Sequence, residues 1–211
     1  MCSCNLTQYL GNIQNNLSKK IIEEDCFEDI ESVVGVDISF SKDSFAVAAA
    51  VVVDFNTIEV LEEKTLEVEV LFPYITGFLG FREADAAVSV LKTLDSKFDV
   101  LMVNGHGIMH PRGFGLASHV GLLMDVPAIG VAKRLIDGNY KLYDNSLKII
   151  KIKDKAVGAC DKHKCISVGH KISLNTALSI VQKTSHFIMP EPIRSAHILA
   201  TQTMKELAQN I

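Results

Sequence analysis

The sequence FDVLMVNGHGIMHPRGFGLASHVGLLMDVPAIGVAK, residues 98–133, decides the fold because two buried-strand patterns flank a glycine-rich loop and a helical segment. The apolar run FDVLMV ends at Asn104, and the loop GHGIMHPRGFG follows directly. The second run, VPAIGV, is short and β-branched, which is typical of a strand buried on both faces, and it leads to Lys133 and Arg134. The segment therefore predicts a strand, a loop, a helix and a second strand.

Polar side chains follow the first of these strands within a few residues. In open α/β sheets, ligands lie beyond the carboxyl ends of the strands, so Asn104, His110 and Arg112 fall where chemistry is expected. The glycines of the loop allow the backbone to approach a ligand closely. An isolated Gly-x-Gly is as common in an ordinary βαβ turn as in a functional loop. The full run VNGHGIMHPRGFGLASH is a far more specific indicator of a functional loop than Gly-x-Gly alone.

Length and composition indicate one well-packed α/β domain over residues 1–211. The chain is 48% hydrophobic and 22% charged, with five prolines. A formal net charge of -4 does not indicate a nucleic-acid-binding protein, so any such contact requires a local basic patch. No apolar run has the length of a membrane span and the N-terminus lacks a signal-peptide pattern, so we expect a cytoplasmic protein without membrane contact.

The five cysteines form an odd set, which fits reduced thiols in a cytosolic protein better than a disulfide framework. Cys160, His163 and Cys165, with Cys2 and Cys4 far away in the sequence, could also form a zinc site. Their spacings match no standard zinc pattern, so thiols are the preferred interpretation.

The remaining segments predict the elements that surround this core. Residues 1–30 form an amphipathic helix, over residues 5–24, and an acidic connector. The other expected elements are strands over 33–40, 45–55 and 57–70, a helix over 82–94, a basic β elaboration over 146–168, and helices over 173–187 and 192–209. Short turns join the first three strands into an antiparallel meander. This is the element order of the ribonuclease H-like fold, an α/β fold whose mixed central sheet is flanked by helices.

Four polar residues occupy the positions at which that fold gathers divalent metal. Asp37 interrupts the apolar run VVGVDISF, where an unpaired carboxylate is costly to bury. Glu83 lies in the first turn of the predicted helix, Asn104 ends the fourth strand, and His197 lies on the last helix. Taken singly, a frayed strand end, a helix cap and a packed histidine would explain Asp37, Glu83 and His197. The coincidence of all four favours a metal site.

One dense basic patch lies in the β elaboration. Its members are Lys148, Lys151, Lys153, Lys155, Lys162 and Lys164. A solvated surface accounts for such a patch without further function, whereas beside a nucleic-acid site it could follow a phosphate backbone.

Several separated motifs resemble the endonuclease V family over roughly residues 33–200. VGVDISF matches the strand with the first metal carboxylate, which gives that role to Asp37. PYITGFLGFRE resembles the family's Pro-Tyr-Ile-Pro-Gly wedge followed by Phe-Arg-Glu. The resemblance implies that Tyr74 fills the gap left by an extruded base and that Glu83 is the second metal carboxylate. The core motif VNGHGIMHPRGFGLASH matches with Asn104 where the family has an acidic metal ligand.

The same resemblance supplies the other site residues. HPR and GVAKR match at His110, Arg112 and Lys133, and RSAHILA places His197 near the metal or its water. His110 or His197 could then orient or deprotonate the attacking water, and Lys133 could offset the negative charge that develops on the phosphate. Thr76 replaces the second proline of the wedge. In the family, main-chain groups of the wedge and the glycine loop enclose the base, and by position these belong to Gly77, Leu79, Gly105 and Leu116.

The resemblance implies an endonuclease that recognises deaminated purine, chiefly hypoxanthine in inosine or deoxyinosine, as a step of DNA repair. The cut falls at the second phosphodiester on the 3′ side and leaves 3′-hydroxyl and 5′-phosphate ends. The expected cofactor is Mg²⁺, for which Mn²⁺ can substitute. The expected partner is inosine-containing DNA, with RNA as an alternative, and a monomer is expected.

Asn104 departs from the family pattern. Its amide oxygen can ligate a hard cation but brings no negative charge, so metal affinity and rate should fall. Three explanations are open: a natural homologue with weakened or altered activity, a non-catalytic protein that binds inosine or mismatches, and a deliberate Asp-to-Asn change that traps a substrate complex. We favour a loss of rate over a loss of recognition because the other motif positions are intact. A ribonuclease H-like nuclease without base preference is a weaker alternative.

Overall fold

A computed structural model describes residues 5–41, 45–136, 146–152 and 154–209. Its strands are β1 (Ser32–Phe40), β2 (Phe45–Asp54), β3 (Val60–Glu69), β4 (Val100–Asn104), β5 (Ala128–Ala132), β6 (Lys148–Ile152), β7 (Lys155–Cys160) and β8 (Cys165–His170). Its helices are α1 (Leu6–Leu17), the short 3-10 helix η1 (Ser18–Lys20), α2 (Leu79–Leu91), α3 (Leu116–Met124), α4 (Leu174–Thr184) and α5 (Glu191–Gln209).

The strands form one eight-stranded mixed sheet in the order β3-β2-β1-β4-β5-β8-β7-β6. β1, β2 and β3 pair antiparallel, which confirms the predicted meander. β4 then pairs parallel with both β1 and β5 at the centre of the sheet. Since β2 is almost wholly apolar it is buried on both faces, whereas the alternating β3 keeps one face toward solvent. The expected α/β architecture is confirmed.

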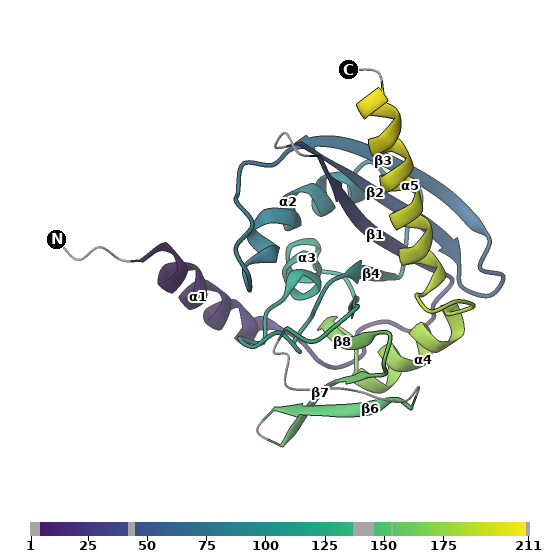
Figure 1. The fold of residues 1–211 in the computed structure, drawn as a ribbon. Helices are drawn as coiled ribbons and strands as arrows, with labels where there is room; N and C mark the ends of the chain where they lie inside the picture. The colour runs from purple at the N-terminus through teal and green to yellow at the C-terminus, as the bar shows by residue number, and fades with distance from the viewer. Residues whose placement is uncertain (1–4, 42–44, 137–145, 153, 210–211) are drawn as a thin grey trace.

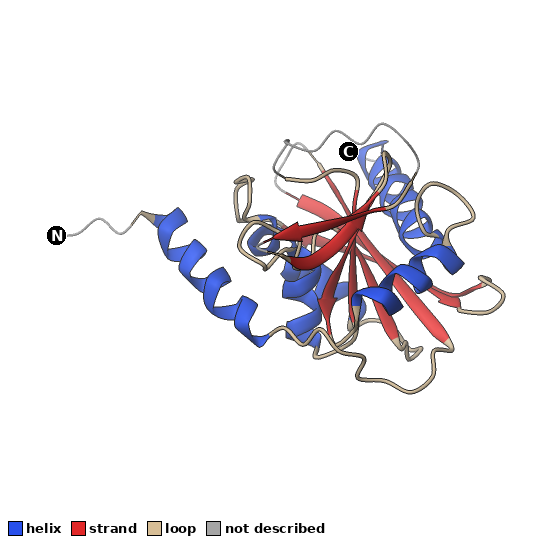
Figure 2. Cartoon of the chain, turned by 90° about the horizontal axis from the view of Figure 1, so that it is seen from below, coloured by secondary structure: helices blue, strands red, loops and turns tan. Residues whose placement is uncertain are grey.

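Helices cover both faces of the sheet (Figure 1 and Figure 2). Along β1, successive side chains point to opposite faces, so Val33 packs in the cluster with α4 and α5, and Val34 packs in the cluster with α2 and α3. The N-terminal α1 projects from the side of the molecule nearest α3 (Figure 1). Within the described residues, no helix is long and apolar enough to span a membrane.

Several helix boundaries differ from the sequence prediction: α2 ends at Leu91, not at residue 94, α4 ends at Thr184, not at residue 187, and two further differences are informative. The first helix was expected over residues 5–24, but α1 ends at Leu17. The chain beyond it is extended at Ile21 and hydrogen bonds at the end of β8, where Ile22 N donates to His170 Nδ1 and Lys171 N donates to the Ile22 oxygen. The second helix was expected from residue 82, but α2 begins at Leu79, inside the wedge motif. Phe78, its N-cap, makes no side-chain capping hydrogen bond, so no cap residue marks this start in the sequence.

The segment expected as a β elaboration continues the central sheet, since β8 pairs antiparallel with β5. Cys160 and Cys165 form a disulfide across the β7–β8 hairpin, which corrects the expectation of reduced thiols for this pair and leaves no zinc site between them. Cys2 and Cys4 lie outside the described residues, as does Lys153 of the basic patch.

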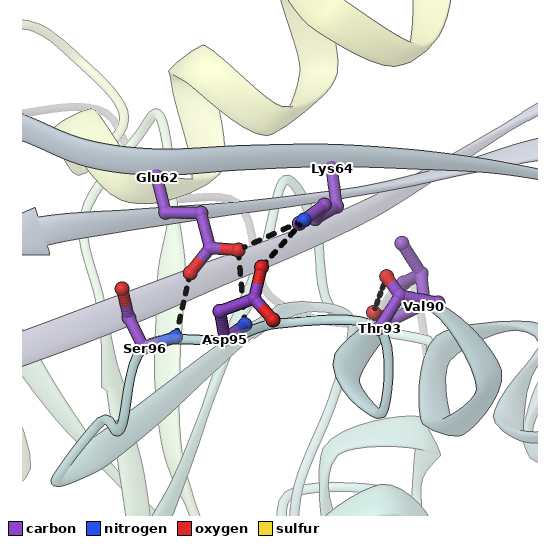
Figure 3. A network of polar contacts seen from close by, with 6 residues as sticks. All are labelled: Glu62, Lys64, Val90, Thr93, Asp95 and Ser96. Atoms are coloured by element: carbon purple, nitrogen blue, oxygen red, sulfur yellow. Dashed lines mark hydrogen bonds and ion pairs between the residues drawn. The ribbon is translucent and has the colours of Figure 1, made fainter.

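A polar network joins the end of α2 to the far edge of the sheet (Figure 3). Glu62 on β3 accepts hydrogen bonds from the backbone N–H groups of Asp95 and Ser96, at 3.0 and 2.7 Å, and Lys64 pairs with Asp95 at 2.9 Å. These main-chain hydrogen bonds lower the pKa of Glu62 to about 2. The network fixes the chain between α2 and β4, the two elements that lead into the polar strand ends described below.

Gly35 on β1 allows α5 to lie directly against the sheet. A Cβ at this position would come within 2.1 Å of the main-chain carbon of Pro192, in the first turn of α5. Because the obstructing atoms belong to the backbone, no side-chain rotation can relieve the clash. Gly35 therefore sets the distance of the N-terminal half of α5 from β1.

We expect Gly35→Ala to lower the free energy of unfolding by about 1–3 kcal/mol, the usual cost of overpacking a core. Gly11→Ala is a matched control, because a Cβ at Gly11 on α1 would meet only the Arg112 Cδ at an ordinary 3.7 Å. Replacing that helical glycine should leave stability unchanged or raise it by about 0.5–1 kcal/mol. Urea unfolding curves of the two variants measure both values, and an unaltered Gly35→Ala midpoint would contradict the close approach.

Candidate active site

The parallel pairing of β1 with β4 brings Asp37 and Asn104 together. Val36 pairs with Val103, so the next residue of each strand lies at the same level of the sheet, where β4 ends. Asn104 Nδ2 donates to Asp37 Oδ1 at 2.8 Å. Only 10% of the Asp37 side chain is exposed, so this carboxylate is largely removed from water and held by defined partners.

His197 reaches the same carboxylate from α5. Its Nδ1 lies 2.6 Å from Asp37 Oδ2, and 53% of its side chain is exposed. The close approach of α5 at Gly35 places this helix over β1. Since Nδ1 is directed at Asp37, Nε2 on the other side of the ring faces away from that carboxylate, as in an imidazole oriented by an acid.

Glu83 is the second carboxyl group of the cluster, one helical turn after Leu79 on α2. Burial, and then the negative charge of Asp37, together raise the pKa of Glu83 to about 8. The positive charge of Arg82 opposes this shift. Two carboxyl groups held close together out of water are costly unless one is protonated or a cation lies between them.

Lys133 follows the end of β5, the strand next to β4. Asn104 pairs with Val131, so Lys133 lies just beyond the strand end at which Asp37 and Asn104 meet. It is exposed, as is the neighbouring Arg134. Two exposed cationic residues therefore follow the strand next to the one that ends at Asn104, and an anionic ligand at these strand ends would be stabilised by nearby positive charge.

A small pocket of about 190 Å³ lies beside this cluster. Its lining residues are Gln14, Tyr74, Thr76, Gly77, Leu79, Gly80, His106, His110, Gly115, Leu116 and Ile136. Tyr74 stands at its rim with 69% of the residue exposed, whereas Leu116 is buried. Two elements serve both pocket and cluster: α2 carries Leu79 and Glu83 one turn apart, and Asn104 is followed directly by the glycine loop.

Three side chains hold one wall of the pocket by its main chain. The Gly77 oxygen lies within hydrogen-bonding distance of Gln14 Nε2 at 3.2 Å, His110 Nε2 at 3.0 Å and Arg112 Nη2 at 2.5 Å. Gln14 also donates to the Phe114 oxygen at 2.9 Å and accepts from Arg112 Nε at 2.6 Å. Since Gly77 belongs to the wedge and His110, Arg112 and Phe114 to the glycine loop, these bonds fix the two loops to each other.

The two histidines of the glycine loop are uncharged at neutral pH. Burial, and then the positive charge of Arg112, lower the pKa of His110 to about 4. Burial also lowers the pKa of His106, although a hydrogen bond to the main chain of Arg134 raises it in part. His110 lies in the pocket wall and contacts Gly77, so the structure places it with the pocket residues and not with Asp37.

The structure thus separates the predicted residues into two adjoining groups. Asp37, Asn104 and His197 share direct contacts, with Glu83 close enough for its charge to interact with that of Asp37. The predicted base-binding residues surround the pocket: Tyr74, Gly77, Leu79 and Leu116 line it, Gly105 lies under Leu116, and Arg112 binds Gly77.

Gln14 and His106 are polar residues of the pocket lining that were not predicted from the sequence. Gln14 lies four residues after Leu10 and so on the same, buried face of α1. A glutamine on an otherwise apolar helix face was the feature of the sequence that could have identified it. His106 was inside the quoted loop, but nothing in its spacing distinguished it from a solvated histidine.

The donor set fits a divalent cation in part. Within the described ranges, no group of three or more His, Cys, Asp or Glu side chains is arranged to hold a metal ion. Asp37 and Glu83 supply two carboxyl groups, and Asn104 supplies an amide where a third would complete such a set. Burial, and then the negative charge of Asp37, raise the pKa of Glu83, and a cation beside the two carboxyl groups would favour their ionised forms, so the residues suit a metal that is bound weakly.

The strand order, the helices on both faces and the acidic residues at converging element ends define a nuclease of the ribonuclease H-like class. Comparison with known proteins gives the family. The endonuclease V family profile matches residues 15–198. Endonuclease V of Dictyoglomus thermophilum is 44% identical over 202 residues, covering 91% of this chain and 88% of that protein. The chain belongs to the endonuclease V family and is an endonuclease by that membership.

Solved structures agree with this assignment. The crystal structure of human ENDOV superposes with a TM-score of 0.85 at 30% identity, covering 95% of this chain and 98% of that chain. Ciona intestinalis endonuclease V, crystallised with a 24mer DNA that contains an inosine followed by a ribo-adenosine, gives a TM-score of 0.87 at 28% identity. That match covers 95% of this chain and 98% of the Ciona chain. The predicted ribonuclease H-like fold is confirmed.

The raised pKa of Glu83 predicts how the metal-free protein responds to pH. Between about pH 4.5 and 8 the carboxyl is protonated in the folded state and ionised in the unfolded chain. The folded state therefore binds more protons, and this group's contribution to the free energy of unfolding falls as pH rises through that window. We expect the melting temperature of the metal-free chain to fall with pH more steeply than that of Glu83→Gln.

Asp85→Asn is the matched control for that experiment, because Asp85 is an exposed acid on the same helix. It should keep the slope of the unsubstituted chain. Equal slopes for the unsubstituted chain and Glu83→Gln would show that Glu83 is not a buried, raised-pKa carboxyl.

The contacts of Gln14 predict a loss of stability and of pocket order when its amide is removed. Gln14→Leu leaves the buried Phe114 oxygen and the Arg112 guanidinium without their partner, which should cost about 1–3 kcal/mol of unfolding free energy. Asn16→Ala, on the exposed face of the same helix, should cost less than about 0.5 kcal/mol. Hydrogen exchange of the wedge and glycine-loop amides should accelerate in Gln14→Leu alone. Unchanged exchange there would contradict a role for α1 in holding the pocket.

Proposed function

We propose that this endonuclease recognises deaminated purine, as inosine or deoxyinosine in nucleic acid, and hydrolyses the second phosphodiester on its 3′ side in DNA repair. The observation that carries this proposal is the joint placement of a pocket and a two-carboxyl cluster on the same two elements, α2 and the end of β4. When the base is held in the pocket, the nucleic-acid strand that carries it would run past the acidic cluster. The Ciona relative crystallised with inosine-containing DNA supports this choice of ligand.

The pocket residues are proposed to hold the extruded base. Reading a base within a duplex requires it to leave the stack, and an aromatic side chain can occupy the vacated space. Tyr74 is suited to this role because it is exposed at the pocket rim. Gly77, Leu79, Gly105 and Leu116 would enclose the base, with Arg112 and His110 holding the Gly77 main chain in position.

The acidic residues are proposed to hold Mg²⁺, or Mn²⁺ in its place, through Asp37, Glu83 and Asn104. When bound, such a cation polarises the phosphoryl oxygen, lowers the pKa of the attacking water and offsets charge on the leaving oxygen. Lys133, exposed next to the strand ends, would offset the negative charge that develops on the phosphate. Because Asp37 binds Nδ1 of His197, the exposed Nε2 of that ring can orient the attacking water and take its proton.

Asn104 is proposed to weaken this activity without removing recognition. Its Nδ2 donates to Asp37 Oδ1, so the amide occupies a carboxylate oxygen that a cation would use and adds no charge of its own. Asn104 is not among the residues that line the pocket. A Ciona relative carrying an aspartate-to-asparagine substitution was also crystallised with inosine-containing DNA, so such a substitution in that relative is compatible with inosine-DNA binding.

The same hydrogen bond favours a second candidate function. If the Asn104 amide keeps Asp37 from binding a cation, the chain would be a non-catalytic protein that binds inosine or mismatched strands and recruits other repair proteins. This alternative predicts inosine-selective binding without strand scission, even after the carboxylate is restored.

Restoring the carboxylate separates the two functions. We expect Asn104→Asp to cleave a single-inosine oligonucleotide at least about tenfold faster than the unsubstituted chain in Mg²⁺ or Mn²⁺, because a third anionic ligand strengthens metal binding. Asp37→Ala should abolish cleavage in that background, and the exposed Asp85→Asn should not alter it. Guanosine at the same position is the base control, and DNA and RNA versions of the oligonucleotide compare the two substrates.

The possible outcomes distinguish the candidate functions. Negligible cleavage by both the unsubstituted and the aspartate form, together with tight inosine binding, would favour the non-catalytic alternative. Equal cleavage of inosine and guanosine would instead indicate a nuclease without base preference.

A further inference from the structure

A second cavity, of about 370 Å³, lies on the opposite face of the sheet from the pocket that is proposed to hold the extruded base. Ile166 and Val181 of its lining belong to the core cluster with α4 and α5, whereas Leu116 of the first pocket belongs to the cluster with α2 and α3. None of its described lining residues is proposed above to hold the base or the cation. The lining combines five apolar residues, Leu147, Ile166, Leu178, Val181 and Phe187, with four polar ones, Asp161, Lys164, Gln182 and Ser185.

The strand register places this second cavity at the same edge of the sheet as the acidic residues. β4 and β5 pair in parallel up to Asn104, and the last residue of β5, Ala132, pairs with Cys165 at the start of β8. β8 therefore begins at the sheet edge that carries Asn104 and the acidic cluster. The turn that precedes β8 contributes Asp161 and Lys164 to the cavity, and α4 beside β8 contributes most of the opposite wall (Figure 1).

The first turns of α5 connect the acidic cluster to the second cavity. His197 contacts Asp37, and Arg194 lies three residues earlier, on the same side of the helix. The Arg194 guanidinium lies over the Phe187 ring, 4.5 Å from its centroid, and its Nε donates to Glu191 Oε2 at 3.0 Å. Phe187 in turn lines the cavity, with 60% of the residue exposed. A continuous path therefore runs from the cluster, across one turn of α5, to an aromatic ring at the cavity.

The groups along this path suit a nucleobase and its phosphate. An aromatic face can stack on any base, and cations beside it can bind the backbone, which is the combination used by proteins that bind single strands. Lys133, Arg134 and Lys162 are exposed at the same edge of the sheet, while Asp161 lies 3.7 Å from Lys164 in an ion pair. This set of side chains carries a net positive charge, which favours a polyanion as the ligand.

We propose that the second cavity binds an unpaired base of the nucleic-acid strand on the 3′ side of the cut, with the base stacked on Phe187 and its phosphate beside Arg194. This inference rests on the endonuclease function proposed above, which gives the direction of the strand. Under that function the inosine lies on the α2 and α3 face, and the bond to be cut lies 3′ to it at the acidic cluster. The strand beyond the cut then continues onto the α4 and α5 face, where Arg194 and the cavity follow His197. After the cut, the same contacts hold the fragment that carries the 5′-phosphate.

The test measures the binding of single-stranded oligonucleotides with one deoxyinosine in the absence of divalent metal, so that no strand is cut. In one strand the nucleotides beyond the cut position are intact, and in the other they are abasic, which keeps every phosphate and removes the bases. We expect the unsubstituted chain to bind the intact strand about tenfold more tightly than the abasic strand, the size of effect that one stacked base gives. Phe187→Ala should bind both strands with the affinity that the unsubstituted chain has for the abasic one.

Three further variants separate these contacts from general effects on the protein. Arg194→Gln removes a cation that is proposed to contact a phosphate, so it should weaken the binding of the intact and abasic strands alike. Lys205→Gln removes an exposed cation later on the same helix, and Leu123→Ala truncates an exposed apolar side chain on α3. Both of these controls should keep the two affinities of the unsubstituted chain.

A fluorescent base reports stacking directly. 2-Aminopurine is placed at successive positions beyond the cut, and at one of them its fluorescence should fall on binding to the unsubstituted chain but not on binding to Phe187→Ala. Equal affinity of the unsubstituted chain for intact and abasic strands, or a fluorescence change that Phe187→Ala leaves unaltered, would overturn the cavity site while the preference for inosine over adenosine persists. A chain without that preference would overturn the proposed function, and with it the strand direction on which this site depends.

Discussion

The constraint on which the active site depends is the burial of two carboxyl groups, Asp37 and Glu83, close enough for one to raise the pKa of the other. Folding alone does not favour such an arrangement, because each charge loses its hydration and repels the other. Packing elsewhere must hold it in place. The valine register between β1 and β4 fixes Asp37 beside Asn104, and the small residues Ala84 and Ala87 let α2 lie close to the sheet, with Glu83 carried on the same helix. Local instability at a functional site is thus offset by a well-packed centre.

The pocket depends on a different interaction, the three donors that converge on one main-chain oxygen. Gly77 has a φ of +82°, a conformation that glycine adopts readily, and it turns its carbonyl toward α1 and the glycine loop. On the opposite side of that loop, a Cβ at Gly107 would come within 1.9 Å of the Val168 oxygen, so the loop lies directly against β8. The pocket is therefore held between the N-terminal helix and the central sheet, and segments far apart in sequence determine its shape.

Sequence predicted those features that depend on local pattern. The burial alternation of β3 and the unbroken apolar runs of β2 and β4 indicated the strands of the sheet, and the carboxylate inside the β1 run indicated Asp37. It did not predict contacts that exist only after distant segments pack. Gln14 and Gly77 are 63 residues apart in the sequence. Their hydrogen bond forms only when α1 lies against the wedge, so neither residue could be recognised as part of the pocket beforehand. The start of α2 lacks a capping side chain, and the Cys160–Cys165 pair becomes close only because β7 and β8 form a hairpin.

Under the proposed function, Asn104 would shift the balance between stability and catalysis at the end of β4. With aspartate there, three carboxyl groups would meet, and in the absence of a cation their repulsion would raise the pKa of Glu83 further and destabilise the fold. The amide removes one charge and donates a hydrogen bond to Asp37, which stabilises the metal-free protein. The same hydrogen bond must break before Asp37 can present that oxygen to a metal. If the site holds a cation as proposed, the residue that stabilises the metal-free protein would therefore also lower the affinity for the ion. Both effects would have a single cause, the replacement of one carboxylate oxygen by an N–H donor.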